Sequence, residues 1–267
     1  MVSIDLKGKR ALVMGVTNAR SLGWSIAAKL AEAGATMAFS HQGERLRPTV
    51  EKLTADMPDA RLYAVDVTAE GQVDHMLADL GKAWGSIDYI VHSIAFAPRA
   101  AMDGRYIDTA RNDWVTALEV SAYSLVQAAR AAEGLLNPGG AMVTLSYFAA
   151  EKVVPKYNVM AIAKSALEAS VRYLAYDLGK KGVRVNAVSA GPVKTVAARS
   201  IPGFMKMYSR AAGLAPLGRN VEQEDVGNLG LFLLSPMAAG ITGETVYVDA
   251  GYHIMGMDLG DAAEGEV

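Results

Sequence analysis

Two tyrosines and a lysine are spaced so that their side chains could act together on a proton. Tyr147 follows the apolar run "AMVTLS", and Tyr157 precedes Lys164 by seven residues in "PKYNVMAIAK". Seven residues of α-helix turn through about 700° and rise by about 10.5 Å, so a helix that covers both positions would put Tyr157 and Lys164 on one face. A nearby ammonium favours the ionised form of a phenol, which strengthens it as a proton donor. The same spacing also occurs on half-exposed helices without any function, so the surrounding elements have to decide.

Short apolar runs alternate with helical patterns along the whole chain. The expected strands are "RALVMGV", "TMAFS", "RLYAVDV", "IDYIVHSIA", "AMVTLS", "VRVNAVSA" and "TVYVDA". Strands that are apolar on both faces and alternate with helices indicate a parallel sheet covered on each side. We therefore predict an α/β fold, a single doubly wound Rossmann-like domain with seven parallel strands and its ligands at their carboxyl ends. The domain should span residues 1–257, and the acidic residues 258–267 should form a flexible tail.

The loop after the first strand, "GVTNARSLGWSIA", has features of a dinucleotide site. Small residues such as Gly15 and Ser21 allow backbone amides and a helix N-terminus to reach a pyrophosphate, although the G-x-G-x-x-G pattern is absent and an ordinary turn stays possible. The acid expected about 20 residues further on is replaced by Gln42, which could bind the adenosine half or cap a turn. Asp66 could accept from the adenine amino group or cap the next helix. This stretch leaves the preference between NADH and NADPH open.

Composition excludes several classes of protein. The 267 residues are 51% hydrophobic and carry a net charge of −2, which speaks against nucleic-acid binding. The absence of cysteine excludes disulfides and thiolate chemistry, and four scattered histidines give no metal-site spacing. No apolar run reaches the roughly 18 residues of a membrane span, and the first residues lack the apolar core of a signal peptide. We therefore expect a cytoplasmic protein that has no metal site and does not associate with a membrane.

The motifs together resemble one family. The runs "VHSIAFAP", "RVNAVSAGPVKT", "EDVGN" and "ITGETVYVDAGY" accompany the tyrosines, and Tyr147 lies ten residues before Tyr157. Over residues 5–256 the chain resembles the short-chain dehydrogenase/reductase superfamily and, within it, the type I enoyl-[acyl-carrier-protein] reductases, which carry Tyr-x₆-Lys. Members that reduce carbonyls carry Tyr-x-x-x-Lys, whereas the fourth residue after Tyr157 is Ala161.

This resemblance implies NADH-dependent reduction of the trans-2 double bond of fatty acyl thioesters, the last reductive step of the elongation cycle; NADPH stays possible. It implies that Tyr157 binds the thioester oxygen and its enolate, that Lys164 binds the nicotinamide ribose, and that Tyr147 supports the acyl site, with Ala97 against the substrate. It also implies an acyl carrier protein as partner and a homotetramer. The implied cofactor-binding residues are Gly15, Ser21, Leu22, Gln42, Asp66, Val67, Ile94, Lys164, Val193 and Thr195.

Residues 193–213 form an insertion too long for a simple connection, which is typical of a lid or binding loop. Ile201, Phe204 and Met207, together with Met160, could line an acyl channel, because methionine adapts to chains of different length. Ordinary core packing or an oligomer contact is the alternative. The same stretch is positively biased, which suits an acidic carrier protein but also fits solvated charges. Its basic residues are Lys194, Arg199, Lys206 and Arg210.

Two other functions remain open at this point. A short-chain reductase of carbonyls, such as 3-oxoacyl thioesters, would share the fold but should carry the shorter tyrosine–lysine spacing. A non-catalytic nucleotide-sensing protein of the same fold would not need an intact tyrosine–lysine pair.

Overall fold

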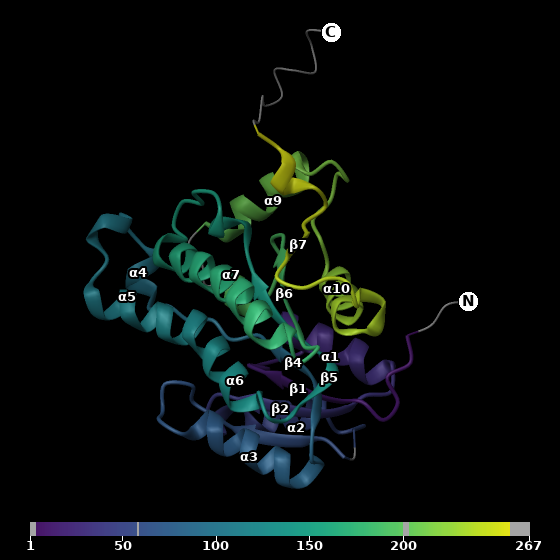
Figure 1. Ribbon diagram of the computed structural model, residues 1–267. Coiled ribbons are helices and arrows are strands. Elements are labelled where there is room, and N and C mark those ends of the chain that lie inside the picture. The colour runs from purple at the N-terminus through teal and green to yellow at the C-terminus, as the bar shows by residue number, and fades with distance from the viewer. Residues whose placement is uncertain (1–3, 58, 200–202, 257–267) are drawn as a thin grey trace, which may run out of the picture.

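The computed structural model describes residues 4–57, 59–199 and 203–256 (Figure 1). Within these residues, seven strands form one sheet in the order β3-β2-β1-β4-β5-β6-β7. Every pairing is parallel, so the predicted doubly wound sheet is confirmed. The strands are β1 (Arg10–Met14), β2 (Thr36–His41), β3 (Arg61–Ala64), β4 (Ile87–His92), β5 (Leu136–Ser146), β6 (Arg184–Ala190) and β7 (Thr245–Val248).

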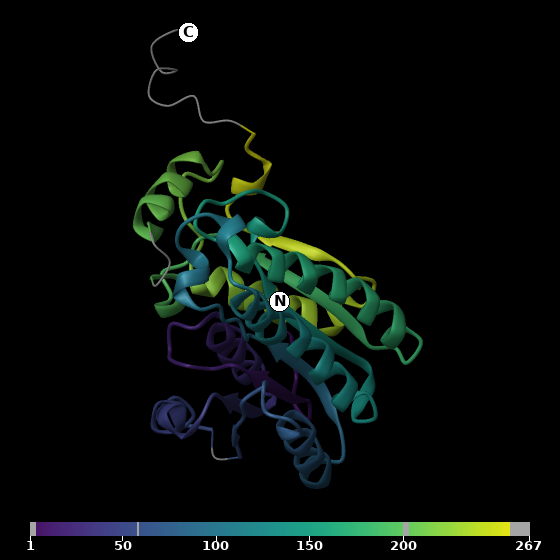
Figure 2. The ribbon, with the colours of Figure 1, turned by 90° about the vertical axis from the view of Figure 1, so that its left-hand side faces the viewer.

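Both faces of the sheet are apolar, and helices cover each of them (Figures 1 and 2). Val13 of β1 and Val91 of β4 are fully buried against α1 (Leu22–Glu32) and α10 (Gln223–Leu234). Their neighbours Leu12 and Ile90 point to the opposite face, because successive strand residues alternate. There they pack with α3 (Gln72–Trp84), α6 (Ser124–Ala132) and α7 (Asn158–Gly179).

A long helical stretch between β4 and β5 changes its type part-way along. It runs as α5 (Arg111–Leu118), a π-helical turn η3 (Glu119–Tyr123) and α6, without a break between them. The remaining α-helices are α2 (Arg47–Leu53), α4 (Arg99–Met102), α8 (Val196–Arg199) and α9 (Phe204–Leu214). The 3₁₀ turns are η1 (Glu44–Leu46), η2 (Tyr106–Asp108), η4 (Phe148–Ala150), η5 (Pro236–Ala238) and η6 (Tyr252–Ile254).

The insertion predicted for residues 193–213 contains α8 and α9. Figures 1 and 2 show α9 at the same end of the molecule as the C-terminal segment. The predicted channel residue Ile201 and the predicted tail at 258–267 lie outside the described residues. Among the helices that the structure describes, none is long and apolar enough to cross a membrane.

Candidate active site

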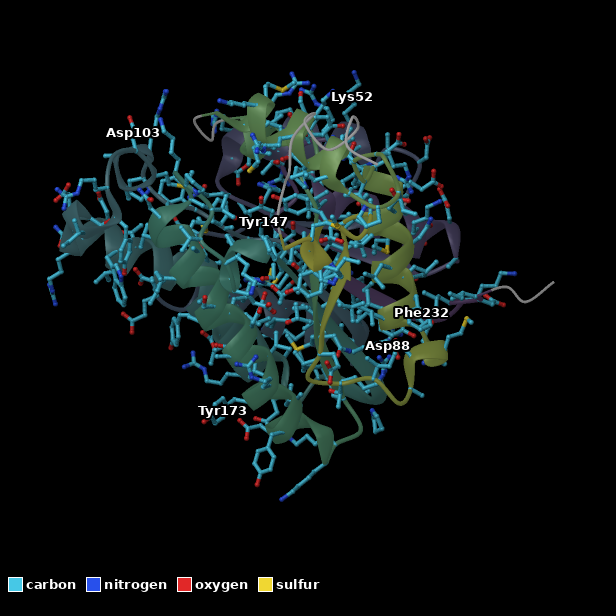
Figure 3. All side chains as sticks on the ribbon, turned by 90° about the horizontal axis from the view of Figure 1, so that it is seen from above. Lys52, Asp88, Asp103, Tyr147, Tyr173 and Phe232 are labelled. Carbon is cyan, nitrogen blue, oxygen red and sulfur yellow. The ribbon has the colours of Figure 1, made fainter. Side chains whose placement is uncertain are left out.

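The end of β5 and the start of α7 bring the two tyrosines together. Tyr147 follows the last residue of β5, and its ring centroid lies 5.0 Å from that of Tyr157 at an interplanar angle of 58°. Seen from above in Figure 3, Tyr147 lies near the centre of the molecule. Tyr157 is the residue before α7, so it precedes the helix rather than lying inside it. Its backbone is nevertheless helical (φ −93°, ψ −23°), although Asn158, the first residue of α7, has a positive φ of 37°.

Tyr157 is held between two strained residues. Lys156 and Asn158 have positive φ angles of 66° and 37°, a region that costs a residue with a side chain about 1–3 kcal/mol. The Asn158 amide donates to the Gly104 carbonyl (3.4 Å), and the Tyr157 backbone N–H donates to Val154 (3.1 Å). Strain of this kind persists where the surrounding structure must aim a side chain, which is typical of active sites.

Lys164 lies two turns into α7 with its amine beneath the end of β5. The side chain is buried, and Nζ donates a hydrogen bond of 2.6 Å to the backbone oxygen of Leu145. An ammonium has three N–H donors, and the structure assigns one of them to a described residue. The amine therefore has donors available for hydroxyl groups of a ligand.

Burial sets the protonation of this pair. Burial raises the pKa of Tyr157 above its ordinary value of 10, and Tyr147 raises it further. The prediction that Lys164 would favour an ionised phenol is therefore wrong, because burial and Tyr147 set the shift and the lysine does not contribute to it. Burial also lowers the pKa of Lys164 to about 8. Burial thus favours the protonated phenol, which can donate a hydrogen bond, and weakens the hold of the amine on its proton.

Apolar side chains surround the two tyrosines. Tyr157 and Met160 belong to one buried cluster, and Ala97 and Tyr147 pack against it. The Tyr147 hydroxyl contacts the Met207 sulfur at 3.3 Å, so α9 reaches the site. These predicted substrate-binding residues therefore lie together. Phe204, predicted for the same channel, is buried in α9 against Tyr208, with ring centroids 5.8 Å apart.

The loop after β1 meets the loop after β4 at the carboxyl edge of the sheet. Gly15 has a φ of +90°, and a Cβ on it would lie 2.3 Å from the Ser93 oxygen and 2.9 Å from Cγ1 of Ile94. The Gly15 N–H donates to the Ser40 carbonyl at 3.0 Å. The glycine therefore makes room for Ser93, and its amide is already bonded rather than free for a pyrophosphate. Strands β1 and β4 are the point from which the chain winds outward in both directions, where ligands of such sheets bind.

The two residues predicted to contact adenosine lie close to each other. Asp66 accepts hydrogen bonds from the Thr68 backbone N–H (2.9 Å) and hydroxyl (2.7 Å). These bonds hold the pKa of Asp66 below its ordinary value, with a further contribution from the Gln42 side chain. The alternative that Asp66 caps the next helix is wrong, because α3 begins only at Gln72. Gln42 is exposed beside this carboxylate, so both side chains can reach a ligand.

The sequence matches the family described as "Enoyl-(Acyl carrier protein) reductase" over residues 15–253. The chain belongs to this family. A relative in the enoyl-acyl-carrier-protein reductase family, "Enoyl-[acyl-carrier-protein] reductase [NADH] 1" of Rhizobium meliloti (strain 1021), is 47% identical over 259 residues, 97% of this chain and 95% of that protein.

Solved structures agree with this assignment. The enoyl-[acyl-carrier-protein] reductase (NADH) from Aquifex aeolicus VF5 matches with a TM-score of 0.92 and 46% identity, covering 95% of this chain and 99% of that chain. The reductase of Anaplasma phagocytophilum, crystallised with NAD, matches with a TM-score of 0.91 and 44% identity, covering 94% of this chain and 96% of that chain.

The remaining predicted cofactor contacts of this enoyl-acyl-carrier-protein reductase family member lie at the same edge. Val193 and Thr195 are buried just after β6, and the Thr195 hydroxyl accepts from the Ala198 N–H (3.0 Å) at the start of α8. Val67 is buried after β3. Ser21 immediately precedes α1, which begins at Leu22, and donates its hydroxyl to the Asn18 carbonyl at 2.8 Å. These residues follow the carboxyl ends of β3 and β6 or precede α1, which places them at the edge where ligands of such sheets bind.

Sequence reasoning missed the residues that hold the loop after β4. Ser121, fully buried in the π-helical turn, accepts from the Phe96 N–H (2.9 Å) and donates to the Phe96 carbonyl (3.1 Å). His92 bonds the hydroxyls of Thr144 (2.9 Å) and Ser124 (2.8 Å), and burial lowers its pKa to about 3. The first pair positions the segment that carries the predicted substrate contact. A serine inside an apolar helix gives no sequence signal, whereas π-helical turns frequently occur at functional sites.

Proposed function

We propose that this chain reduces the trans-2 double bond of fatty acyl thioesters with NADH, the last reductive step of fatty acid elongation. The observation that carries the proposal is the position of Tyr157. It precedes Lys164 by seven residues, and its ring centroid lies 5.0 Å from that of Tyr147. Hydride delivered to the β-carbon makes negative charge appear on the thioester oxygen, three bonds away. A hydrogen-bond donor for this reaction must be displaced from the carbon that receives hydride, and the longer spacing supplies that displacement.

Each side chain of the site has a separate role in the proposed reaction, and its surroundings determine that role. The bound nicotinamide supplies the hydride. Tyr157, kept protonated by burial, donates to the developing enolate oxygen, and such preorganised donors in a dry site are each worth roughly 3–4 kcal/mol. Lys164 holds the ribose hydroxyls with the donors that Leu145 leaves available. Tyr147 and Met160 form the apolar wall that excludes water from the reacting carbons.

One assay distinguishes the candidate reactions. The protein is mixed with NADH or NADPH and with either crotonyl or acetoacetyl thioester, and absorbance of the reduced nicotinamide is followed. We expect loss of absorbance with crotonyl thioester only, and faster with NADH, because Gln42 offers no positive charge to a 2′-phosphate. Consumption with acetoacetyl thioester would indicate a carbonyl reductase. Binding of NADH without turnover of either thioester would indicate a nucleotide sensor.

We further propose that acyl carrier protein docks on the basic residues of α8 and α9. Arg199 and Lys206 are exposed, and the Lys194 ammonium stands 4.4 Å from the centre of the Tyr208 ring. The Tyr147–Met207 contact connects α9 to the acyl site. A positive surface beside the channel would orient an acidic carrier so that its thioester enters the site.

Reversing the charges at Arg199 and Lys206 to glutamate should raise KM for carrier-bound enoyl substrate about tenfold. The KM for the uncharged N-acetylcysteamine thioester should stay unchanged, because that substrate has no charged carrier. Steady-state kinetics on both substrates checks this. As a matched control, reversal of the exposed Lys82 and Lys180 should change neither constant. Equal increases for both substrates would contradict docking.

The proposal includes a homotetramer. Tyr173 and Tyr176 of α7 are 75% and 73% exposed, and Figure 3 shows Tyr173 projecting from the molecule. A shallow groove of about 470 Å³ is lined by Trp114, Val115 and Tyr123 on the neighbouring helices. Exposed apolar surface of this kind marks association. Light scattering in solution checks the assembly, and a monomeric mass would contradict it.

A further inference from the structure

A buried acid lies one helical turn beyond the catalytic lysine. Glu168 follows Lys164 by four residues, so both side chains leave the same face of α7. Its side chain is only 7% exposed, although glutamate is almost never fully buried unless it is paired. The mechanism above gives this carboxylate no role.

Glu168 and Lys164 hold consecutive residues at the end of β5. The Lys164 amine donates to the Leu145 carbonyl at 2.6 Å, and the Ser146 hydroxyl donates to the Glu168 carboxylate. The next residue along the chain is Tyr147. The two side chains therefore fix the strand end that carries the acyl-site tyrosine.

Hydroxyl groups continue this polar layer across the sheet. Ser146 is in register with Ser189 of β6, which is in register with Tyr247 of β7. The Ser189 hydroxyl is buried without a partner among the described residues. The Tyr247 hydroxyl donates to Glu151 at 2.6 Å.

Titratable groups from several neighbouring elements surround Lys164 and Glu168, and most of them are neutral. On β4, His92 is neutral because burial lowers its pKa to about 3. Burial raises the pKa of Tyr157 and of Tyr247, so both phenols are neutral as well. Arg172 of α7 favours the ionised form of Glu168, and Glu151 opposes it.

Glu168 lies one helical turn from the lysine and offsets part of the effect of burial on it. Burial disfavours the ammonium of Lys164, and Glu168 is the group that counteracts this effect by raising its pKa. In return, Ser146, Arg172 and Lys164 favour the carboxylate, against the burial that raises the pKa of Glu168. The ammonium of Lys164 and the carboxylate of Glu168 therefore stabilise each other in the protein interior.

We propose that Glu168 is a positioning residue, whose carboxylate keeps the Lys164 amine charged and, through Ser146, fixes the strand end that precedes Tyr147. This inference rests on the proposed function, because it assigns Lys164 the task of holding the ribose. A charged amine keeps two N–H donors after bonding Leu145, enough for two neighbouring hydroxyls, whereas a neutral amine keeps one.

Replacing Glu168 by glutamine tests the charge alone, since the amide keeps the size and can still accept from Ser146. In the cofactor-free protein labelled with ¹³C at lysine Cε, NMR should show the Lys164 pKa falling by about one unit. The Kd for NADH should rise severalfold at pH 8.5, where a smaller fraction of the variant than of the unsubstituted protein keeps the ammonium. At pH 6, where both proteins keep the ammonium, the two affinities should converge.

Two further variants keep the proposal falsifiable. Glu151→Gln removes a nearby negative charge that does not act directly on Lys164, and its pH profile of NADH binding should match the unsubstituted protein. With Lys164→Arg, whose guanidinium stays charged, adding Glu168→Gln should no longer shift that profile. An unmoved Lys164 pKa, or a loss of affinity equal at both pH values, would overturn the proposal. Because NMR and NADH binding need no acyl substrate, failure of the proposed reduction would leave this result readable.

Discussion

Replacing Tyr157 by phenylalanine should lower turnover of an enoyl thioester about a hundredfold or more. The hydroxyl is the group aimed at the oxygen on which negative charge develops, and loss of one such donor costs roughly 3–4 kcal/mol in a dry site. The ring itself packs against Tyr147 and Met160, and phenylalanine preserves that packing. We therefore expect kcat to fall while the Kd for NADH stays constant. Single-turnover measurements with saturating NADH separate these quantities.

Tyr147→Phe is the matched control for that experiment. It removes the hydroxyl that contacts Met207 but leaves the donor at Tyr157 in place. We expect an effect within a few-fold on kcat, because the contact to sulfur is a weak hydrogen bond. An unchanged rate in Tyr157→Phe would remove this phenol from the mechanism, and a larger loss in Tyr147→Phe would reverse the two roles.

The positions of Tyr147, Tyr157 and Lys164 could be predicted from the sequence because helical and strand periods are local rules. The apolar run that becomes β5 ends at Ser146, so Tyr147 had to appear at the carboxyl edge. The helical spacing predicted that Tyr157 and Lys164 belong to one helical segment, and α7 begins one residue after Tyr157 and contains Lys164. The parallel sheet followed from the same patterns, since strands apolar on both faces need cover on both sides.

The properties of these groups could not be predicted in the same way, because they depend on long-range packing. The direction of the Tyr157 pKa shift is set by burial and by Tyr147, and not by the lysine charge that the sequence spacing suggests. Glu168 looks like any acid on a helix until the structure places Ser146 against it. Ser121 acquires its role only because a π-helical turn aims it at the loop after β4. The Ser146–Glu168 and Phe96–Ser121 contacts join residues 22 and 25 positions apart in the chain.

Replacing Gly15 by alanine should destabilise the protein by about 3 kcal/mol and weaken NADH binding at least tenfold. Its φ of +90° is unfavourable for alanine, at a cost of roughly 1–2 kcal/mol. The added methyl group would also lie 2.3 Å from the Ser93 backbone oxygen, which cannot move aside as a flexible side chain can. The loops after β1 and β4 would have to separate, and the proposed dinucleotide site lies at their junction. Urea unfolding and NADH titration measure the two effects.

Gly8→Ala separates the backbone conformation from the contact. Gly8 has a similar positive φ of +76°, but a Cβ there would meet no atom within 4 Å. This variant should therefore lose only the conformational part, about 1 kcal/mol, and should bind NADH as the unsubstituted protein does. The difference between the two variants measures how tightly Ser93 must approach the first loop. If both variants lost the same stability and neither lost NADH affinity, the close approach at Gly15 would have no part in forming the cofactor site.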